Sequence, residues 1–246
     1  MNVLSQSAQS AIKLVAIDTA CGACSAALWS DGVVVSSRFR EMVRGQAEAL
    51  MPMVVDVMRD AQVDFAALDL IAVTIGPGSF TGLRTGLAAA RGLAQARALP
   101  VIGVTTTEAI ALAAIRRADT GPRRAVTVVL NSRRNDLYVQ HFSAGLVPMG
   151  APFTALPEEI ARAAPRSGVV FAGDATGQIM DIVQAGEDSP EFSCFPVSGP
   201  DAIFVAEVAA NRWSSQPVKE TSFPDKLLYL RAPDAIRPVD EGRLRQ

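Results

Sequence analysis

A glycine-rich segment in the first half of the chain has the residue types of a ligand-binding loop. It follows an apolar run at residues 68–75 and precedes a long helical pattern, the place where α/β folds present backbone to ligands. The segment lacks the Lys-Ser/Thr pair of a P-loop, and its third glycine comes one residue too late for a dinucleotide-binding fingerprint. Its glycines then serve a tight turn, with a hydroxyl group capping the helix. The candidate loop residues are Gly76, Pro77, Gly78, Ser79, Thr81 and Arg84.

A second candidate for chemistry is the pair Asp18-Thr19, which ends the first β-like run of the chain. An acidic residue here, closely followed by glycine, is what the first phosphate loop of a two-lobed kinase requires. No glycine appears before Gly22, so the sequence predicts at most a vestigial phosphate site at Asp18 and Thr19. Asp18 can equally cap the turn between two strands.

The sequence contains few residues that could bind a metal ion. His141 is the only histidine and lies in a strand-like run, which excludes any two-histidine metal motif. Cys21 and Cys24 form a single C-x-x-C without the second pair that a zinc site requires, and Cys194 stands apart. We therefore expect no metal site in this chain.

The composition predicts a globular protein with an ordinary core. Of the 246 residues, 49% are hydrophobic and 20% are charged, and 23 basic against 25 acidic residues leave a net charge of −2. This balance argues against an autonomous nucleic-acid binder, because such proteins carry a basic field. The polar tail at 1–11 is unlike a signal peptide, and no apolar run reaches the ~20 residues of a membrane helix. We expect a cytoplasmic protein without membrane contact.

The first half of the chain alternates β-like and helical patterns. Three β-like runs, with an Asp31-Gly32 hairpin turn between the last two, predict an antiparallel meander. Two helical stretches then alternate with two continuous apolar runs, which predict parallel strands, and a third helix follows. The predicted strands span 12–17, 24–30, 33–39, 68–75 and 101–104, and the helices 46–60, 83–98 and 108–116. This order is that of one ribonuclease-H-like α/β lobe.

The second half of the chain repeats this style with weaker signals. Strands are predicted at 126–130, 137–142 and 169–173 and a helix at 201–213, with a proline-rich stretch among them. The sequence contains no periodic repeat. The predicted domains are a first lobe at 12–110 and a second lobe at 111–230, with tails at 1–11 and 232–246.

Small residues recur at three- and four-residue spacing along the predicted helix 83–98. An internal glycine costs a soluble helix roughly 1 kcal/mol, so this stripe indicates that another element packs very close to it. That element is either the chain's own sheet or a helix of another subunit. On the second interpretation, Gly86→Arg breaks a dimer and leaves the fold intact. The partner interface then consists of Leu50, Met53, Val54, Val57, Phe80, Gly82, Leu83, Gly86, Leu87 and Ala90.

Four runs of the sequence resemble the TsaB (YeaZ) family: IDTACGACSAAL, DLIAVTIGPGSFTGLRTGLAAARGLA, GVTTTEAIA and LYLRAPDA. The resemblance covers residues 13–143 well and returns at 201–234. It implies two ribonuclease-H-like lobes of the actin/Hsp70/sugar-kinase (ASKHA) type, and a dimer formed by the helices near 46–60 and 79–98. The chain departs from the family pattern at Gln46, where relatives often carry histidine, and at Asn131, where they often carry aspartate.

The resemblance implies a non-catalytic scaffold subunit that pairs with a TsaD-type metalloprotein for threonylcarbamoylation of adenosine 37 in tRNAs reading ANN codons. A TsaE-type ATPase joins that complex, tRNA is contacted indirectly, and the chain forms a homodimer when the partner is absent. No cofactor is assigned to this chain, and ATP or ADP at the interface of the complex stays open. The alternative is an ASKHA-fold ATP-dependent phosphotransferase, which Asp18-Thr19 and the two-lobe pattern would support. A peptidase would lack any catalytic constellation here.

Arginines in the middle of the chain offer a further hypothesis, a tRNA-facing cluster, for which each phosphate contact would add to the salt dependence of binding. The alternative is a solvated lobe surface, because Asp119 and Asp136 neutralise part of the charge. The arginines are Arg116, Arg117, Arg123, Arg124, Arg133 and Arg134.

Overall fold

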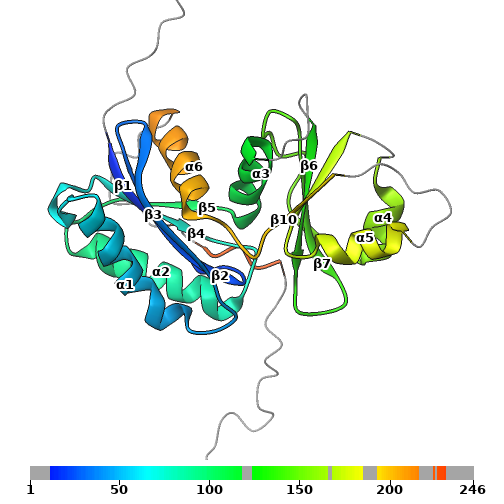
Figure 1. The fold of residues 1–246 in the computed structure, drawn as a ribbon, viewed down its shortest axis with the longest axis horizontal. Helices are drawn as coiled ribbons and strands as arrows, with labels where there is room; N and C mark the ends of the chain where they lie inside the picture. The colour runs from blue at the N-terminus through cyan, green and yellow to red at the C-terminus, as the bar shows by residue number, and fades with distance from the viewer. Residues whose placement is uncertain are drawn as a thin grey trace, which may run out of the picture.

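The computed structural model describes residues 12–117, 124–165, 168–184, 193–215, 224 and 226–230. Two five-stranded mixed sheets stand side by side, with helices on their outer faces and two further helices between them (Figure 1). The tails at 1–11 and 232–246, together with Asp119 and Arg123, lie outside the described residues. None of the helices in the described ranges is both long and apolar enough to span a membrane.

The first sheet begins with the predicted antiparallel meander. β1 (Lys13–Asp18) pairs with β2 (Ala23–Ser30), which in turn pairs with β3 (Val33–Glu41). Asp31 and Gly32 form the turn between β2 and β3, with φ angles of 54° and 89°. These left-handed conformations are what a two-residue hairpin turn needs, so the Asp-Gly signal is confirmed.

The rest of the first sheet is parallel and buried. β4 (Leu70–Thr74) and β5 (Val101–Val104) run parallel to β1, which gives the strand order β3-β2-β1-β4-β5. α1 (Gln46–Asp60) and α2 (Phe80–Gln95) pack side by side on one face of this sheet (Figure 1). The short helix η1 (Phe65–Ala67) joins α1 to β4. The order of strands and helices predicted for this half is confirmed.

The second sheet repeats the topology of the first. Its order, β10-β9-β6-β7-β8, places an antiparallel β6-β7-β8 meander beside the parallel strands β9 and β10. Read from the other edge, this is again the order 3-2-1-4-5, so the chain contains two ribonuclease-H-like lobes, as predicted. The strands are β6 (Ala125–Asn131), β7 (Leu137–Phe142), β8 (Phe153–Ala155), β9 (Val169–Gly173) and β10 (Ser193–Pro196), and the outer helices are α4 (Pro157–Ala163) and α5 (Thr176–Gln184).

The helices α3 (Thr106–Arg117) and α6 (Ala202–Ser215) fill the space between the two sheets (Figure 1). α3 is buried on both sides, because Ala109 and Leu112 join the core of the first sheet while Ile110 and Ala114 join that of the second. α6 packs against β1 and β2 of the first sheet. The two lobes are therefore joined by a continuous apolar layer.

The lobe bounds 12–110 and 111–230 stay predictions, and the packing departs from them at two places. α6 buries its apolar face on the first sheet although it follows the second lobe in sequence. The segment 226–230 also returns to the first sheet, where the Leu228 amide donates to the Ile75 carbonyl at 2.7 Å. Sequence order alone did not reveal this, because each segment crosses back after the second sheet is complete.

Candidate functional site

The glycine-rich loop between β4 and α2 packs against the turn that joins β1 to β2. A Cβ atom at Gly78 would lie 2.4 Å from the carbonyl oxygen of Ala20, and the Ser79 amide donates to the same oxygen at 2.7 Å. Ser79 Oγ accepts from the Gly82 amide at 3.3 Å and so caps α2. Gly76 has a φ of 109° and precedes a cis peptide bond. The glycines therefore allow two segments of this chain to approach closely.

Asp18 and Thr19 are buried beneath this loop. Asp18 Oδ1 accepts from Thr74 Oγ1 at 2.6 Å and from the Ala20 amide at 3.1 Å, while Oδ2 has no hydrogen-bond partner in the described part of the chain. Thr19 Oγ1 donates to the Gly82 carbonyl at 2.7 Å, which ties the turn to α2. Burial raises the pKa of Asp18 to about 7, although the Thr74 hydrogen bond opposes this shift. The predicted phosphate site is thus enclosed by the chain itself.

Asn131 occupies the position in the second lobe that Asp18 occupies in the first, at the end of the first strand of the sheet. Its Oδ1 accepts from the Arg133 amide at 2.7 Å, the same local bond that Asp18 makes. Asp174 Oδ1 accepts from the Asn131 amide at 2.8 Å, and burial raises the pKa of Asp174. Among the described residues, no group of three His, Cys, Asp or Glu side chains is placed to hold a metal ion.

The remaining residues singled out for chemistry have structural roles. Cys21 and Cys24 are buried, and burial raises both thiol pKa values, that of Cys24 to about 11, so neither is a reactive thiolate. His141 lies on β7, where its Nδ1 is 2.9 Å from Thr127 Oγ1. Gln46, where relatives often carry histidine, is the first residue of α1, and its side chain donates to the Met42 carbonyl at 3.0 Å. This departure from the family pattern therefore lies at the start of a helix, where the side chain bonds to backbone.

The small-residue stripe of α2 faces the chain's own first sheet. A Cβ atom at Gly82 would lie 2.0 Å from the carbonyl oxygen of Thr19, and one at Gly86 would lie 2.8 Å from Thr19 Oγ1. Gly86→Arg would therefore break the fold, which corrects the expectation that the fold survives it. All but one of the residues predicted for the partner interface are buried in the chain alone: Leu50, Met53, Val54, Val57, Gly82, Leu83, Gly86, Leu87 and Ala90, with only Phe80 exposed.

The residues that α1 and α2 expose to solvent are not those predicted for the partner interface. Met51 and Val55 on α1 are exposed, as are Ala88 and Gly92 on α2. A Cβ atom at Gly92 would meet nothing within 4 Å. A groove of about 410 Å³ runs between the two helices and η1, and its lining is mainly apolar, with Met51 on α1 and the backbone at Gly92 on α2. We call Met51, Val55, Ala88 and Gly92, together with this groove, the outer helical face. The sequence could have indicated this surface, because its residues are the positions of the two predicted helices that lie opposite the apolar stripe.

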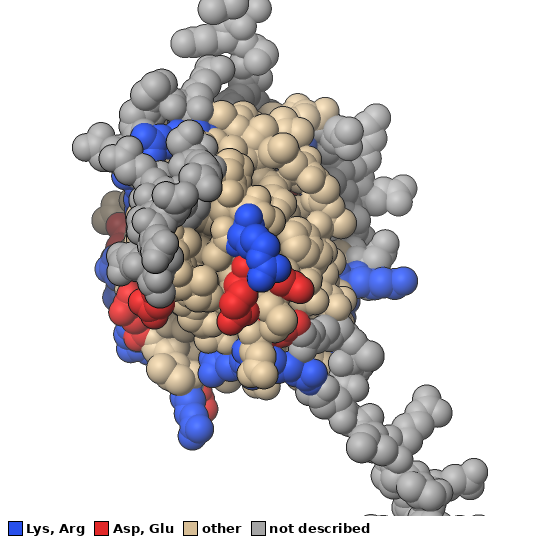
Figure 2. All heavy atoms as spheres, turned by 90° about the vertical axis from the view of Figure 1, so that its right-hand side faces the viewer, with Lys and Arg blue, Asp and Glu red and all other residues tan. Residues whose placement is uncertain are grey.

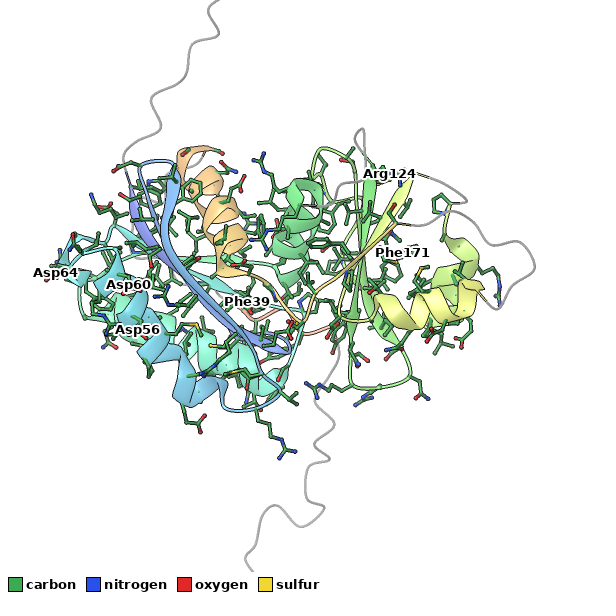
Figure 3. The ribbon with its side chains drawn as sticks, viewed as in Figure 1. Phe39, Asp56, Asp60, Asp64, Arg124 and Phe171 are labelled. Carbon is green, nitrogen blue, oxygen red and sulfur yellow. The ribbon has the colours of Figure 1, made fainter. Side chains whose placement is uncertain are left out.

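The predicted arginine cluster is divided by the fold. On α3, Arg116 forms an ion pair with Glu207 on α6, and Arg117 forms one with Asp201, the residue just before α6. Arg124 precedes β6 and lies at the end of the second sheet, away from α1 (Figure 3). Arginines that already pair with carboxylates of the same chain have less freedom to bind phosphate, which favours the solvated-surface interpretation for Arg116 and Arg117.

Arg133 and Arg134 follow β6 at the turn to β7, where the charge of Arg133 opposes the burial that raises the pKa of Asp174. The end of the second lobe displays blue and red side chains close to one another (Figure 2). On this face, the described basic residues form no continuous patch of the kind that grips a nucleic-acid backbone.

Comparison with known proteins now gives the chain a family. Residues 40–232 match the family model described as "TsaD: tRNA N6-adenosine threonylcarbamoyltransferase". The tRNA threonylcarbamoyladenosine biosynthesis protein TsaB of Escherichia coli K12 is 38% identical over 127 residues, which are 52% of this chain and 53% of that protein. An uncharacterised protein of Mycobacterium tuberculosis H37Rv is 32% identical over 230 residues, covering 90% and 93% of the two chains. The solved structure of YeaZ from Pseudomonas aeruginosa superposes with a TM-score of 0.73 at 27% identity, over 85% of this chain and 96% of that one.

The chain has two lobes of the same strand order, and most of it matches the TsaD family model, so it belongs to the broad family that this model covers. Within that class, the chain belongs to the TsaB (YeaZ) family, which confirms the resemblance drawn from its motifs. The chain spans about half the length of the E. coli TsaB that it matches.

Proposed function

We propose that this chain is an accessory subunit in the biosynthesis of threonylcarbamoyladenosine in tRNA. It pairs with a TsaD-type metalloprotein, which transfers the threonylcarbamoyl group to adenosine 37 of tRNAs reading ANN codons. The family match supports the pathway, and the E. coli relative is named for this biosynthesis. The observation that carries the proposal is the outer helical face, an apolar and sterically open surface on two long helices.

The residues at two strand ends support a non-catalytic role. A phosphotransferase of this fold would hold accessible acidic groups at these positions. The Asp18 carboxyl is fully buried and bonded to Thr74, and the second lobe carries Asn131 at the matching place. The chain has one histidine, so it lacks the pair of histidines with which TsaD-like proteins bind their metal. These features favour the scaffold over the kinase-like alternative.

The outer helical face suits a helical partner. Gly92 has open space around its Cβ position and Ala88 is small, so the backbone of a partner helix can approach α2 closely. Met51 and Val55 supply apolar area on α1, which would be unprotected in water without a partner. In the absence of the TsaD-type subunit, the same face joins two copies of this chain, because related surfaces pair around a two-fold axis.

The other components join through the complex rather than through this chain alone. A net charge of −2 gives little attraction to RNA phosphates, so the partner subunits provide most of the grip on tRNA. A TsaE-type ATPase binds the assembled pair, and any ATP or ADP lies between subunits. The role of this chain in the complex is then to bind the metal-bearing subunit and stabilise its active conformation.

The proposal is tested by the threonylcarbamoyladenosine content of tRNA in cells that lack this protein, measured by mass spectrometry of digested tRNA. The wild-type gene restores the modification, and Gly92→Arg fails to restore it because the bulky cation blocks helix approach. Gly177→Arg on α5 is the matched control, since its Cβ position is also helical, exposed and open, and it restores the modification. Normal modification in cells without the protein would refute the proposal.

A further inference from the structure

An exposed cluster of aromatic and cationic side chains lies where the start of α2 meets the segment 226–230. The rings of Phe80 and Tyr229 are 5.6 Å apart between centroids, and the Arg84 guanidinium carbon lies 3.6 Å from the centroid of Phe80. Arg84 Nε donates to Tyr229 Oη at 3.2 Å. Phe80 is 45% exposed and Tyr229 is 43% exposed, so the cluster faces solvent while its members hold one another.

The backbone beneath this cluster is fixed on both sides. The Leu228 amide donates to the Ile75 carbonyl at 2.7 Å, and a Cβ atom at Gly76 would lie 2.7 Å from the Leu228 carbonyl oxygen. Ser79 caps the helix that carries Phe80. Two of the family-like runs, distant in sequence, thus meet here, and the side chains they present are ordered before any partner binds.

The residue types of the cluster match those that dominate protein interfaces. Tyrosine and arginine are enriched among the residues whose truncation weakens binding most, and phenylalanine is enriched in interface cores. An arginine stacked on an aromatic ring keeps its hydrogen-bonding edge for a carboxylate, which it binds in a fixed geometry. Rigid exposed aromatic rings also lose little conformational entropy on binding.

The cluster is continuous with the outer helical face. Arg84 precedes the exposed Ala88 by one helical turn, and both side chains point away from the first sheet. On α2, Ala88 and Gly92 of the outer helical face allow close approach but offer little side-chain area of their own. The cluster at the start of α2 supplies what that surface lacks, namely large apolar rings beside a fixed cation.

We propose that Phe80, Arg84 and Tyr229 form the energetic centre of the docking surface for the TsaD-type partner, which contributes an apolar side chain and a carboxylate to it. This inference rests on the proposed function for the identity of the partner. It goes beyond that function by assigning the affinity to the start of α2 and to Tyr229 of the C-terminal segment. Tyr229 acts partly as a positioning residue, because its hydroxyl group holds Arg84 over Phe80.

The test is isothermal titration calorimetry of full-length variants against the purified TsaD-type chain. Phe80→Ala and Tyr229→Ala each weaken the Kd by roughly tenfold or more, the range of central interface residues. Tyr229→Phe keeps the ring and loses only the bond to Arg84, so it weakens the Kd by a smaller factor. Phe153→Ala is the matched control, because Phe153 lies on β8 of the second lobe with a similar exposed fraction of 42%. Thermal unfolding of each variant checks that the fold is retained.

The outcomes separate this inference from the proposed function. If the wild-type chain does not bind the TsaD-type protein, the proposed function fails. If the wild-type chain binds and Phe80→Ala leaves the Kd within twofold, the proposed function stands and this inference is overturned. It is also overturned if Phe80→Ala binds the partner normally but weakens the affinity of the assembled complex for tRNA, because the cluster would then be an RNA-stacking surface.

Discussion

The two lobes share one strand order but place different groups at equivalent points. Asp18 and Asn131 each end the first strand of a sheet, and each accepts a hydrogen bond from the amide two residues later. In the first lobe this side chain is a buried carboxyl group under α2, whereas in the second lobe it is an exposed amide. The repeated backbone therefore does not maintain a repeated acidic site.

The outer helices of the two lobes differ more than the strands do. α1 and α2 have 15 and 16 residues, whereas their counterparts α4 and α5 have 7 and 9. Only the first pair is long enough to offer several turns to another helix pair. The two lobes therefore differ in the length of their outer helices, whereas each contains a tightly packed glycine: Gly82 beside the Thr19 carbonyl oxygen and Gly173 beside that of Val129.

The largest expected effect on stability comes from adding one methyl group to α2. Gly82→Ala places a Cβ atom 2.0 Å from the Thr19 carbonyl oxygen, so α2 must move off the β1–β2 turn. Overpacking against backbone lowers the free energy of unfolding by about 3 kcal/mol. Urea denaturation measures this, and a Gly82→Ala variant as stable as the wild type would show that α2 is not held so closely.

The buried carboxyl group of the first lobe makes stability depend on pH. The folded pKa of Asp18 is about 7 against an ordinary value of 3.8, so the folded state binds more protons between these values. Stability from this group is therefore lost as the pH rises toward 7. Asp18→Asn gains about 2 kcal/mol relative to the wild type between pH 5 and pH 8. Denaturation curves of both proteins at the two pH values measure the change, and an equal difference at both would contradict it.

Substituting the exposed glycines on the outer helices of the two lobes is expected to stabilise the protein, whereas substituting the buried Gly82 destabilises it. Gly92→Ala on α2 and Gly177→Ala on α5 add a methyl group to open space, since neither Cβ position has an atom within 4 Å. Each substitution raises the free energy of unfolding by roughly 0.5–1 kcal/mol, the difference in helix propensity. Thermal unfolding is the measurement, and destabilisation by Gly92→Ala would mean that α2 is packed on both sides.

The smallest expected effect concerns the ion pair between Arg116 on α3 and Glu207 on α6. Arg116 is largely exposed, so its pair with Glu207 is screened by solvent. Arg116→Ala lowers the free energy of unfolding by about 0.5 kcal/mol, and less at high salt. Urea denaturation at two salt concentrations checks this, and a loss of several kcal/mol would show that the two lobes depend on this pair for their joint packing.

Much of the fold was predictable from the sequence because local signals agree in the first lobe. The Asp31-Gly32 turn, the helical spacing of 46–60 and the apolar run at 68–75 each indicated the observed element. In the second lobe α4 and α5 were missed, since helices of 7 and 9 residues give too few turns for a clear period. The place of α6 on the first sheet depends on contacts between distant segments, which no local pattern encodes.

The candidate site was predictable only in part. The sequence indicated α1 and α2 as the important helices, and the alternative that the small residues pack on the chain's own sheet was the better one for Gly82 and Gly86. Apolar spacing marks the buried face of an amphipathic helix, so it selected core residues instead of outward ones. The contact of Tyr229 with Phe80 joins residues 149 positions apart, and the hydrogen bond from Arg84 to Tyr229 joins residues 145 positions apart, so both required the tertiary structure.

The central claim is that the outer helical face of the first lobe binds a TsaD-type partner. Size-exclusion chromatography with light scattering, applied to equimolar mixtures with the purified TsaD-type chain, tests it most directly. We expect a one-to-one complex for the wild type and for Gly177→Arg, and separate peaks for a folded Gly92→Arg variant. A folded Gly92→Arg variant that still elutes as the one-to-one complex would show that the partner does not bind the outer helical face.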